Sequence, residues 1–145
     1  MPRPAEYDNL IRMGYFHEQP ATPGFLAQYL LVADQCLDGA RKTEHSTPAY
    51  LLAYEGFYQL VQAVLEHHGV RAADRPGHRV VAIQRVCADL QLSPGQQKLV
   101  TDAHTRRNET VYRAPLPPVS LAESKAMIQI LEAALPLAHK LVAMP

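Results

Sequence analysis

The clearest pattern of hydrophobic and polar positions lies in residues 50–66. Polar side chains recur there at steps of four, three and four residues, and apolar side chains fill most of the positions between them. The polar positions are Glu55, Gln59, Gln62 and Glu66. This spacing matches the turns of an α-helix and leaves only a narrow polar stripe. We therefore expect a helix that is buried on most of its circumference and lies at the centre of the fold.

A second helical pattern lies near the end of the chain. Apolar residues repeat there at steps of three and four, opposite a polar side that includes Lys125 and Glu132. The apolar residues are Ile128, Leu131, Leu135, Ala138 and Val142. Pro136 lies inside the pattern and is expected to kink this helix, because proline lacks the backbone N–H. No window alternates polar and apolar residues between turn signals, so the sequence predicts no sheet.

Hydroxyl side chains mark four helix starts. Thr22, Thr47 and Ser93 each precede a proline, and a proline at the first helical position has no N–H to leave unpaired. Ser93 with Gln96, and Ser120 with Glu123, also match the capping-box pattern. We expect helices to start near Pro23, Pro48, Pro94 and Leu121.

Glycines mark where two of these helices are expected to end. Gly39 and Gly69 follow the segments that begin at Thr22 and Thr47. Pro76 and Gly77 introduce a further helix over residues 78–92, and a short helix is expected over residues 9–16. The sequence therefore predicts an all-α fold, an antiparallel bundle of four to five main helices plus the short N-terminal helix.

Length and composition agree with one globular domain. The 145 residues form a single unit 1–145 with a core over about 23–141, and 48% apolar residues supply that core. Fourteen basic residues balance fourteen acidic ones, which excludes a nucleic-acid partner held by a general basic field. Cys36 and Cys87 indicate buried thiols of a reducing compartment, and no apolar run suits a signal peptide or a membrane span, so we expect neither. We expect a cytoplasmic protein without membrane contact.

Arg107 interrupts an apolar stripe in residues 93–113. The stripe consists of Val100, Ala103, Val111 and Ala114. His104, Asn108 and Tyr112 follow each other at spacings of four on the neighbouring face. A guanidinium turned towards a core must be paired or line a cleft. Two interpretations follow: a structural arginine that pairs with a core carboxylate, or a polar cluster that holds a phosphate.

The run of residues 106–112 resembles the motif of the HEPN superfamily. That motif has an arginine, then a polar residue that is often asparagine, then a histidine after four to six intervening residues. Arg107 matches the arginine and Asn108 the polar residue, on the penultimate helix of a small all-α chain. The resemblance covers roughly residues 23–141. It departs from the motif at Tyr112, which occupies the histidine position.

The resemblance implies a helical bundle that dimerises so that two motif helices face one cleft. Many HEPN proteins are metal-independent ribonucleases of toxin–antitoxin or defence systems, and others are inactive scaffolds or partners of a nucleotidyltransferase. A ribonuclease without a metal must activate a 2′-hydroxyl, for which imidazole suits and a phenol of pKa about 10 does not. Tyr112 is expected to donate a hydrogen bond to phosphate, and His104 is the candidate to supply the missing imidazole.

A second group of basic residues precedes and begins the helix predicted at 78–92. It contains Arg71, Arg75, Arg79 and Arg85 against Asp74 alone. If this segment lies beside Arg107, it supplies a local basic patch for phosphate together with Arg106. The alternative is a solvated loop and helix start. No pair of histidines has the spacing of a helical metal site, and we expect neither a metal nor a cofactor.

Three hypotheses remain open at this point. The leading one is a HEPN-like RNA- or nucleotide-binding homodimer, a ribonuclease-type component of a toxin–antitoxin or defence system. The second is a non-catalytic HEPN scaffold, or the substrate-binding partner of a nucleotidyltransferase, which Tyr112 favours. The third is a plain helical interaction module. The sequence leaves open whether the protein is catalytically competent, which RNA it cleaves and whether the dimer is obligate. It also leaves open whether the partner is a nucleotidyltransferase or an antitoxin.

Overall fold

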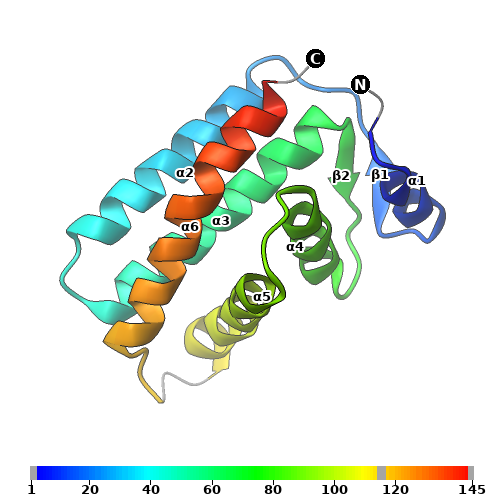
Figure 1. Ribbon diagram of the computed structural model, residues 1–145. Coiled ribbons are helices and arrows are strands. Elements are labelled where there is room, and N and C mark those ends of the chain that lie inside the picture. Colours follow the sequence, from blue (N-terminus) through cyan, green and yellow to red (C-terminus); the bar gives the residue numbers. More distant parts are fainter. Residues whose placement is uncertain (1–2, 114–116, 144–145) are drawn as a thin grey trace.

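A computed structural model describes residues 3–113 and 117–143, except for the side chain of Tyr112. The chain is predominantly helical, which confirms the predicted fold class (Figure 1). Its elements in order are α1 (Ala5–Arg12), β1 (Phe16–Glu18), α2 (Phe25–Lys42), α3 (Ser46–His67), β2 (Val70–Ala72), α4 (His78–Asp89), α5 (Pro94–Asn108), the π-helix η1 (Glu109–Arg113) and α6 (Leu121–Val142).

Helix α3 is the centre of the bundle, as its pattern predicted. It packs against α2 and α6 on one side and against α4, α5 and β2 on the other. Figure 1 shows α2 antiparallel to α3, whereas α6 runs in the same direction as α3. Thirteen of the 22 residues of α3 are buried, and they include Glu66, a member of the predicted polar stripe. The polar stripe of α3 is thus largely covered by other elements.

A two-stranded sheet is present where the sequence predicted none. β1 and β2 are antiparallel, with Phe16 opposite Ala72 and Glu18 opposite Val70. Each strand has three residues, too few to show an alternating pattern in the sequence. The N-terminal helix was also misplaced: it spans Ala5–Arg12 rather than residues 9–16, because the chain turns at Gly14 and then enters β1.

Two of the four predicted helix starts are confirmed in detail. Ser93 and Ser120 cap α5 and α6, and both form the complete capping box. Thr22 and Thr47 are not caps: α2 begins at Phe25 after the left-handed Gly24, and α3 begins at Ser46. In both cases the helix boundary is set without a side-chain cap.

The predicted helix ends are confirmed in part. Gly69, with φ of 71°, follows the end of α3, but Gly39 lies inside α2, which continues to Lys42. Helix α4 starts at His78 as predicted and stops at Asp89 instead of residue 92. Pro136 lies within α6, which extends on both sides of it.

Both cysteines are free, with Cys87 buried and Cys36 only partly so. Among the described residues, no helix is long and apolar enough to cross a membrane.

Candidate functional site

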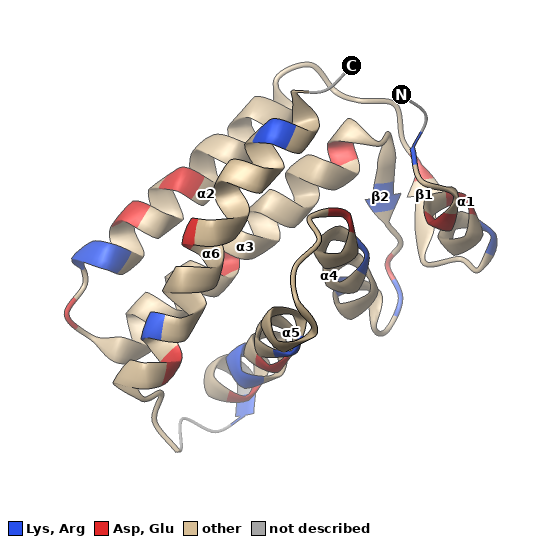
Figure 2. Cartoon of the chain, in the orientation of Figure 1, with Lys and Arg blue, Asp and Glu red and all other residues tan. Residues whose placement is uncertain are grey.

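An open pocket of about 550 Å³ lies between the segment that begins α4 and the last turns of α5. It is lined by residues 74–79 from the first segment and by His104, Arg107 and Asn108 from the second. We call it the α4–α5 pocket. The two basic segments predicted from the sequence therefore do meet. Figure 2 shows basic positions on α4, α5 and η1 around this part of the bundle.

Arg107 faces the bundle, as its place on the apolar stripe predicted. Its side chain is 19% exposed, and its Nε lies 3.1 Å from Oε1 of Glu55 on α3. Its Nη1 also donates to Oδ1 of Asn108 at 3.3 Å. Val111, on the same predicted stripe, is 48% exposed rather than buried, and the predicted stripe residue Ala114 lies outside the described residues. Arg107 thus combines an ion pair with a place on the wall of the α4–α5 pocket.

His104 connects α5 to the central helix α3. Its Nδ1 lies 2.8 Å from the hydroxyl of Tyr54, and its Nε2 lies 3.4 Å from Nδ2 of Asn108. The Asn108 oxygen faces Arg107, so its NH₂ group faces Nε2 and needs a lone pair there. This arrangement fits a neutral imidazole with its proton on Nδ1.

The surroundings of His104 favour the same neutral form. Burial lowers the pKa of His104, and the positive charges of Arg79, Arg107 and His78 lower it further. An imidazole that is neutral near pH 7 can accept a proton. His104 is therefore suited to act as a base beside two guanidinium groups.

Arg79 supplies the second guanidinium of the pocket. Its Cζ lies 4.1 Å above the ring of Tyr58, a cation–π contact that holds the side chain over α3. Burial raises the pKa of Tyr54, and Arg79 opposes that shift through a hydrogen bond and through its positive charge. The Arg79 guanidinium therefore also lies close to the Tyr54 hydroxyl. Tyr54 is thus placed between Arg79 and His104.

The other predicted phosphate ligands have different surroundings. Arg75 lines the pocket, but its Nη1 donates to the carbonyl of Met13 and its Cζ lies 4.1 Å from the centre of the Tyr15 ring. Arg106 donates to Glu123 on α6 and to the carbonyl of Pro117 in the segment that precedes α6. Neither guanidinium is directed by these contacts towards His104.

Arg71 does not join the cluster around His104. Arg71 lines a separate cavity beside β2, which it shares with His78. Arg85, the remaining basic residue of the predicted patch, pairs with Asp89 at 2.9 Å and with Glu6 at 3.9 Å. The side chain of Tyr112 lies outside the described residues. Its backbone belongs to η1, so the motif run crosses a junction from α-helix to π-helix, an irregularity that is frequent at functional sites.

Sequence analysis missed Tyr54, Glu55 and His78 as members of the site. Glu55 was visible only as part of the polar stripe of residues 50–66. That stripe is informative in retrospect, because α4, α5 and β2 pack against α3 and the cavity beside β2 is lined by Gln62 and Glu66 of the stripe. A polar stripe on a helix that is otherwise buried is the signal that could have identified Glu55, whereas it does not mark Tyr54 or His78.

Within the described residues no group of His, Cys, Asp or Glu side chains is arranged to hold a metal ion. No protein-family model matches the chain, and no curated protein shows significant similarity to it. The site must therefore be interpreted from its own geometry.

Proposed function

We propose that the protein is a HEPN-like RNA- or nucleotide-binding protein whose α4–α5 pocket binds phosphate. One observation carries the proposal: Arg79, Arg107, His104 and Asn108, from two separate helices, line the same open pocket. Guanidinium groups are the preferred side chains for bidentate phosphate contacts. A neutral chain thus holds a local basic site, which suits a phosphate ligand rather than non-specific binding along nucleic acid.

The site also has the groups that metal-independent RNA cleavage requires. In this reaction the 2′-hydroxyl attacks the adjacent phosphorus, and the bond to the 5′-oxygen breaks. His104 accepts the 2′-hydroxyl proton at Nε2, whose contact with Asn108 is long at 3.4 Å. Arg79 and Arg107 stabilise the charge on the phosphorane, and the His104 imidazolium returns the proton it accepted to the 5′-oxygen that leaves. We therefore favour a ribonuclease-type activity in which His104 replaces the motif histidine.

The second candidate function is a non-catalytic HEPN protein that binds the substrate for a nucleotidyltransferase. Tyr112 at the position of the motif histidine favours it. This function needs the same phosphate contacts but no base. Binding of RNA without cleavage, with His104→Ala leaving the affinity unchanged, would support it over the ribonuclease.

The decisive experiment separates a phosphate-binding Arg107 from a structural one. Glu55→Gln removes the carboxylate charge that pairs with Arg107 but keeps the guanidinium, whereas Arg107→Ala removes the guanidinium. We expect Arg107→Ala to weaken RNA binding by about 1.5–3 kcal/mol or more, the range for hydrogen bonds to charged groups. Glu55→Gln should retain binding. RNA affinity and cleavage are measured in buffer with a chelator, together with the melting temperature of each variant.

Arg41→Ala is the matched control for that experiment. Arg41 also pairs with a glutamate, Glu132 at 2.6 Å, but lies on α2 outside both pockets. It should leave RNA binding unchanged. A loss of melting temperature in Arg107→Ala without any loss of affinity per folded molecule would reject the phosphate-binding role.

We also propose a homodimer packed partly through residues 93–113. Leu99 and Val111 in this segment are 46% and 48% exposed, so both offer apolar surface to a second copy of the chain. A twofold interface here would bring two α4–α5 pockets near one cleft. Leu99→Glu should shift the protein towards monomer in light scattering. A wild-type monomer at high micromolar concentration would contradict the proposal.

A further inference from the structure

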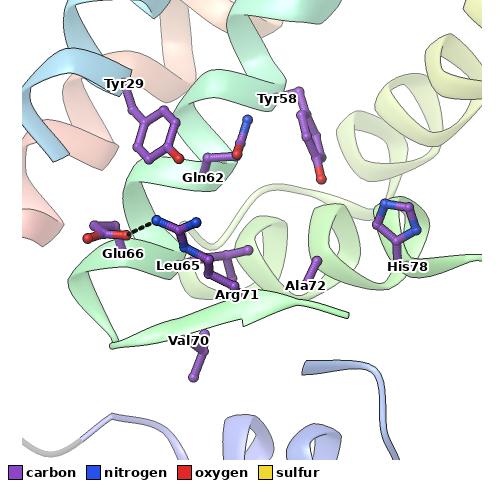
Figure 3. A pocket seen from close by; sticks show the side chains of 9 residues that line it. All are labelled: Tyr29, Tyr58, Gln62, Leu65, Glu66, Val70, Arg71, Ala72 and His78. Carbon is purple, nitrogen blue, oxygen red and sulfur yellow. Dashed lines mark ion pairs between the residues drawn. The ribbon is translucent and has the colours of Figure 1, made fainter. Parts of the chain in front are cut away.

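A second cavity, of about 150 Å³, lies between the polar stripe of α3 and β2. Figure 3 shows its walls: Tyr58 and Gln62 from α3, Tyr29 from α2, and Arg71 reaching up from β2 between them. We call it the β2 pocket. A cavity of roughly this size accepts an aromatic ring. The two phenol rings give it flat apolar surfaces beside a polar floor.

The polar floor consists of the buried Glu66 carboxylate and the Arg71 guanidinium, and both can form further hydrogen bonds. The Glu66 side chain is only 3% exposed, and its Oε1 accepts the backbone N–H of Thr22 at 2.6 Å. Its Oε2 lies 4.0 Å from Nη2 of Arg71, an ion pair too long for a hydrogen bond. The Nε of Arg71 is buried and has no hydrogen-bond partner among the described residues. Donor and acceptor groups thus lie side by side without satisfying each other.

The β2 pocket adjoins the proposed phosphate site. His78 lines both pockets. Tyr58 lines the β2 pocket, and the Arg79 guanidinium that lies over its ring belongs to the α4–α5 pocket. A ligand with a flat polar end and a phosphate end would pass over His78 to occupy both pockets.

We propose that the β2 pocket binds the guanine base of a nucleotide or RNA whose phosphate occupies the α4–α5 pocket. The Arg71 guanidinium donates to O6 and N7 of guanine, the commonest specific contact of arginine with a base. The Glu66 carboxylate accepts from the N1–H and the amino group on the adjacent edge. Tyr29 and Tyr58 contact the base through their rings.

The same groups discriminate against adenine. Adenine has an amino group in place of O6 and an unprotonated N1, so it would put a donor against Arg71 and a lone pair against Glu66. The mismatch at Glu66 leaves a carboxylate that is only 3% exposed without a partner, and the mismatch at Arg71 leaves the guanidinium unpaired against the base. Gln62, which can donate and accept, does not reverse that preference.

The placement of the phosphate in the α4–α5 pocket rests on the proposed function, whereas the placement of the base in the β2 pocket does not. The two placements are therefore tested with separate probes. Isothermal titration calorimetry compares guanosine monophosphate, adenosine monophosphate, guanosine and inorganic phosphate on the wild-type chain. We expect guanosine monophosphate to bind roughly tenfold or more tighter than adenosine monophosphate. Arg71→Ala should abolish this preference and leave phosphate affinity unchanged. Arg107→Ala should weaken phosphate and both nucleotides but keep the guanine preference.

The outcomes separate the two proposals. Equal affinity for the two nucleotides, or a guanine preference that survives in Arg71→Ala, overturns the base pocket even if phosphate binds. If Arg71→Ala loses guanosine binding while Arg107→Ala keeps the wild-type affinity for phosphate, the base pocket is supported and the phosphate site is rejected. Glu66→Gln is a second test of the base pocket, which we expect to weaken guanosine binding. Melting temperatures show that each variant is folded, and Arg41→Ala again serves as the unaffected control.

Discussion

His104 is the residue whose protonation state decides the chemistry of the α4–α5 pocket. Burial lowers the pKa of His104 below 6.5, and the charge of Arg79 is the next largest cause. Arg79→Gln removes that charge, so we predict that the pKa of His104 rises towards 6.5 in this variant. The measurement is an NMR titration of the imidazole protons, with the His104 signal assigned by its loss in His104→Gln.

Arg41→Gln provides the control for that titration. It also removes one positive charge from the chain, but at a distance from the pocket, on α2. The pKa of His104 should not change in this variant. If Arg79→Gln leaves the pKa of His104 unchanged as well, the electrostatic coupling between these two side chains is refuted, and with it the argument for a base held neutral by its neighbours.

Single residues of the site differ in how far the sequence could predict them. Arg107 was predictable, because a guanidinium on an apolar helical stripe requires a partner wherever the helix packs. Its partner Glu55 was not, because the two residues are far apart in the chain and periodicity carries no information about contacts between helices. The same reason applies to Tyr54, whose contact with His104 arises only when α5 packs against α3.

At the scale of helices, Gly56 sets how closely three of them approach. A Cβ at this position would lie 2.8 Å from Cβ of Cys36 on α2 and 2.8 Å from Cδ2 of Leu131 on α6. We predict that Gly56→Ala destabilises the fold by about 1–3 kcal/mol, the usual cost of overpacking, reduced by up to about 1 kcal/mol of helix propensity. Urea unfolding followed by circular dichroism measures the difference.

Gly95→Ala is the matched control at the helix scale. Gly95 lies in the first turn of α5, and a Cβ there would meet only Oγ of Ser93, at an ordinary 3.9 Å. This variant gains helix propensity without crowding and should be neutral or slightly more stable. A Gly56→Ala protein as stable as Gly95→Ala would show that the three helices separate without cost.

Helix boundaries were predictable where the local chemistry alone sets them. Ser93 and Ser120 each bond to the residue three positions on, so both starts follow from a short stretch of sequence. At Thr22 the backbone N–H instead donates to Glu66, a contact between distant segments that a local pattern does not contain. The β1–β2 pair was missed for the same reason, since its two strands meet only in the folded chain.

At the scale of the whole molecule, a polar cluster fastens the N-terminal helix to the bundle. The Tyr7 hydroxyl donates to Oδ2 of Asp89 at 2.5 Å, and Arg85 donates to Oδ1 of the same carboxylate at 2.9 Å. The His68 ring lies 4.6 Å from the Tyr7 ring, and its Nε2 lies 3.8 Å from Asp89. Burial and the carboxylate raise the pKa of Tyr7, which therefore stays a hydrogen-bond donor. The cluster joins α1, the end of α3 and α4.

The protonation of His68 makes the stability of the whole fold depend on pH. Burial lowers the pKa of His68 from 6.5 to about 4, although Asp89 opposes the shift. Between these values the unfolded chain binds a proton that the folded chain does not. The stabilisation is therefore complete above pH 6.5 and is lost progressively as the pH falls to about 4. With the imidazole 11% exposed, solvent screening reduces the expected loss to about 1–2 kcal/mol.

We predict that urea unfolding shows this decline in stability between pH 6.5 and about 4, and that His68→Asn flattens it relative to the wild type. An equally steep decline in His68→Asn would assign the pH dependence to other groups and leave His68 with a packing role alone.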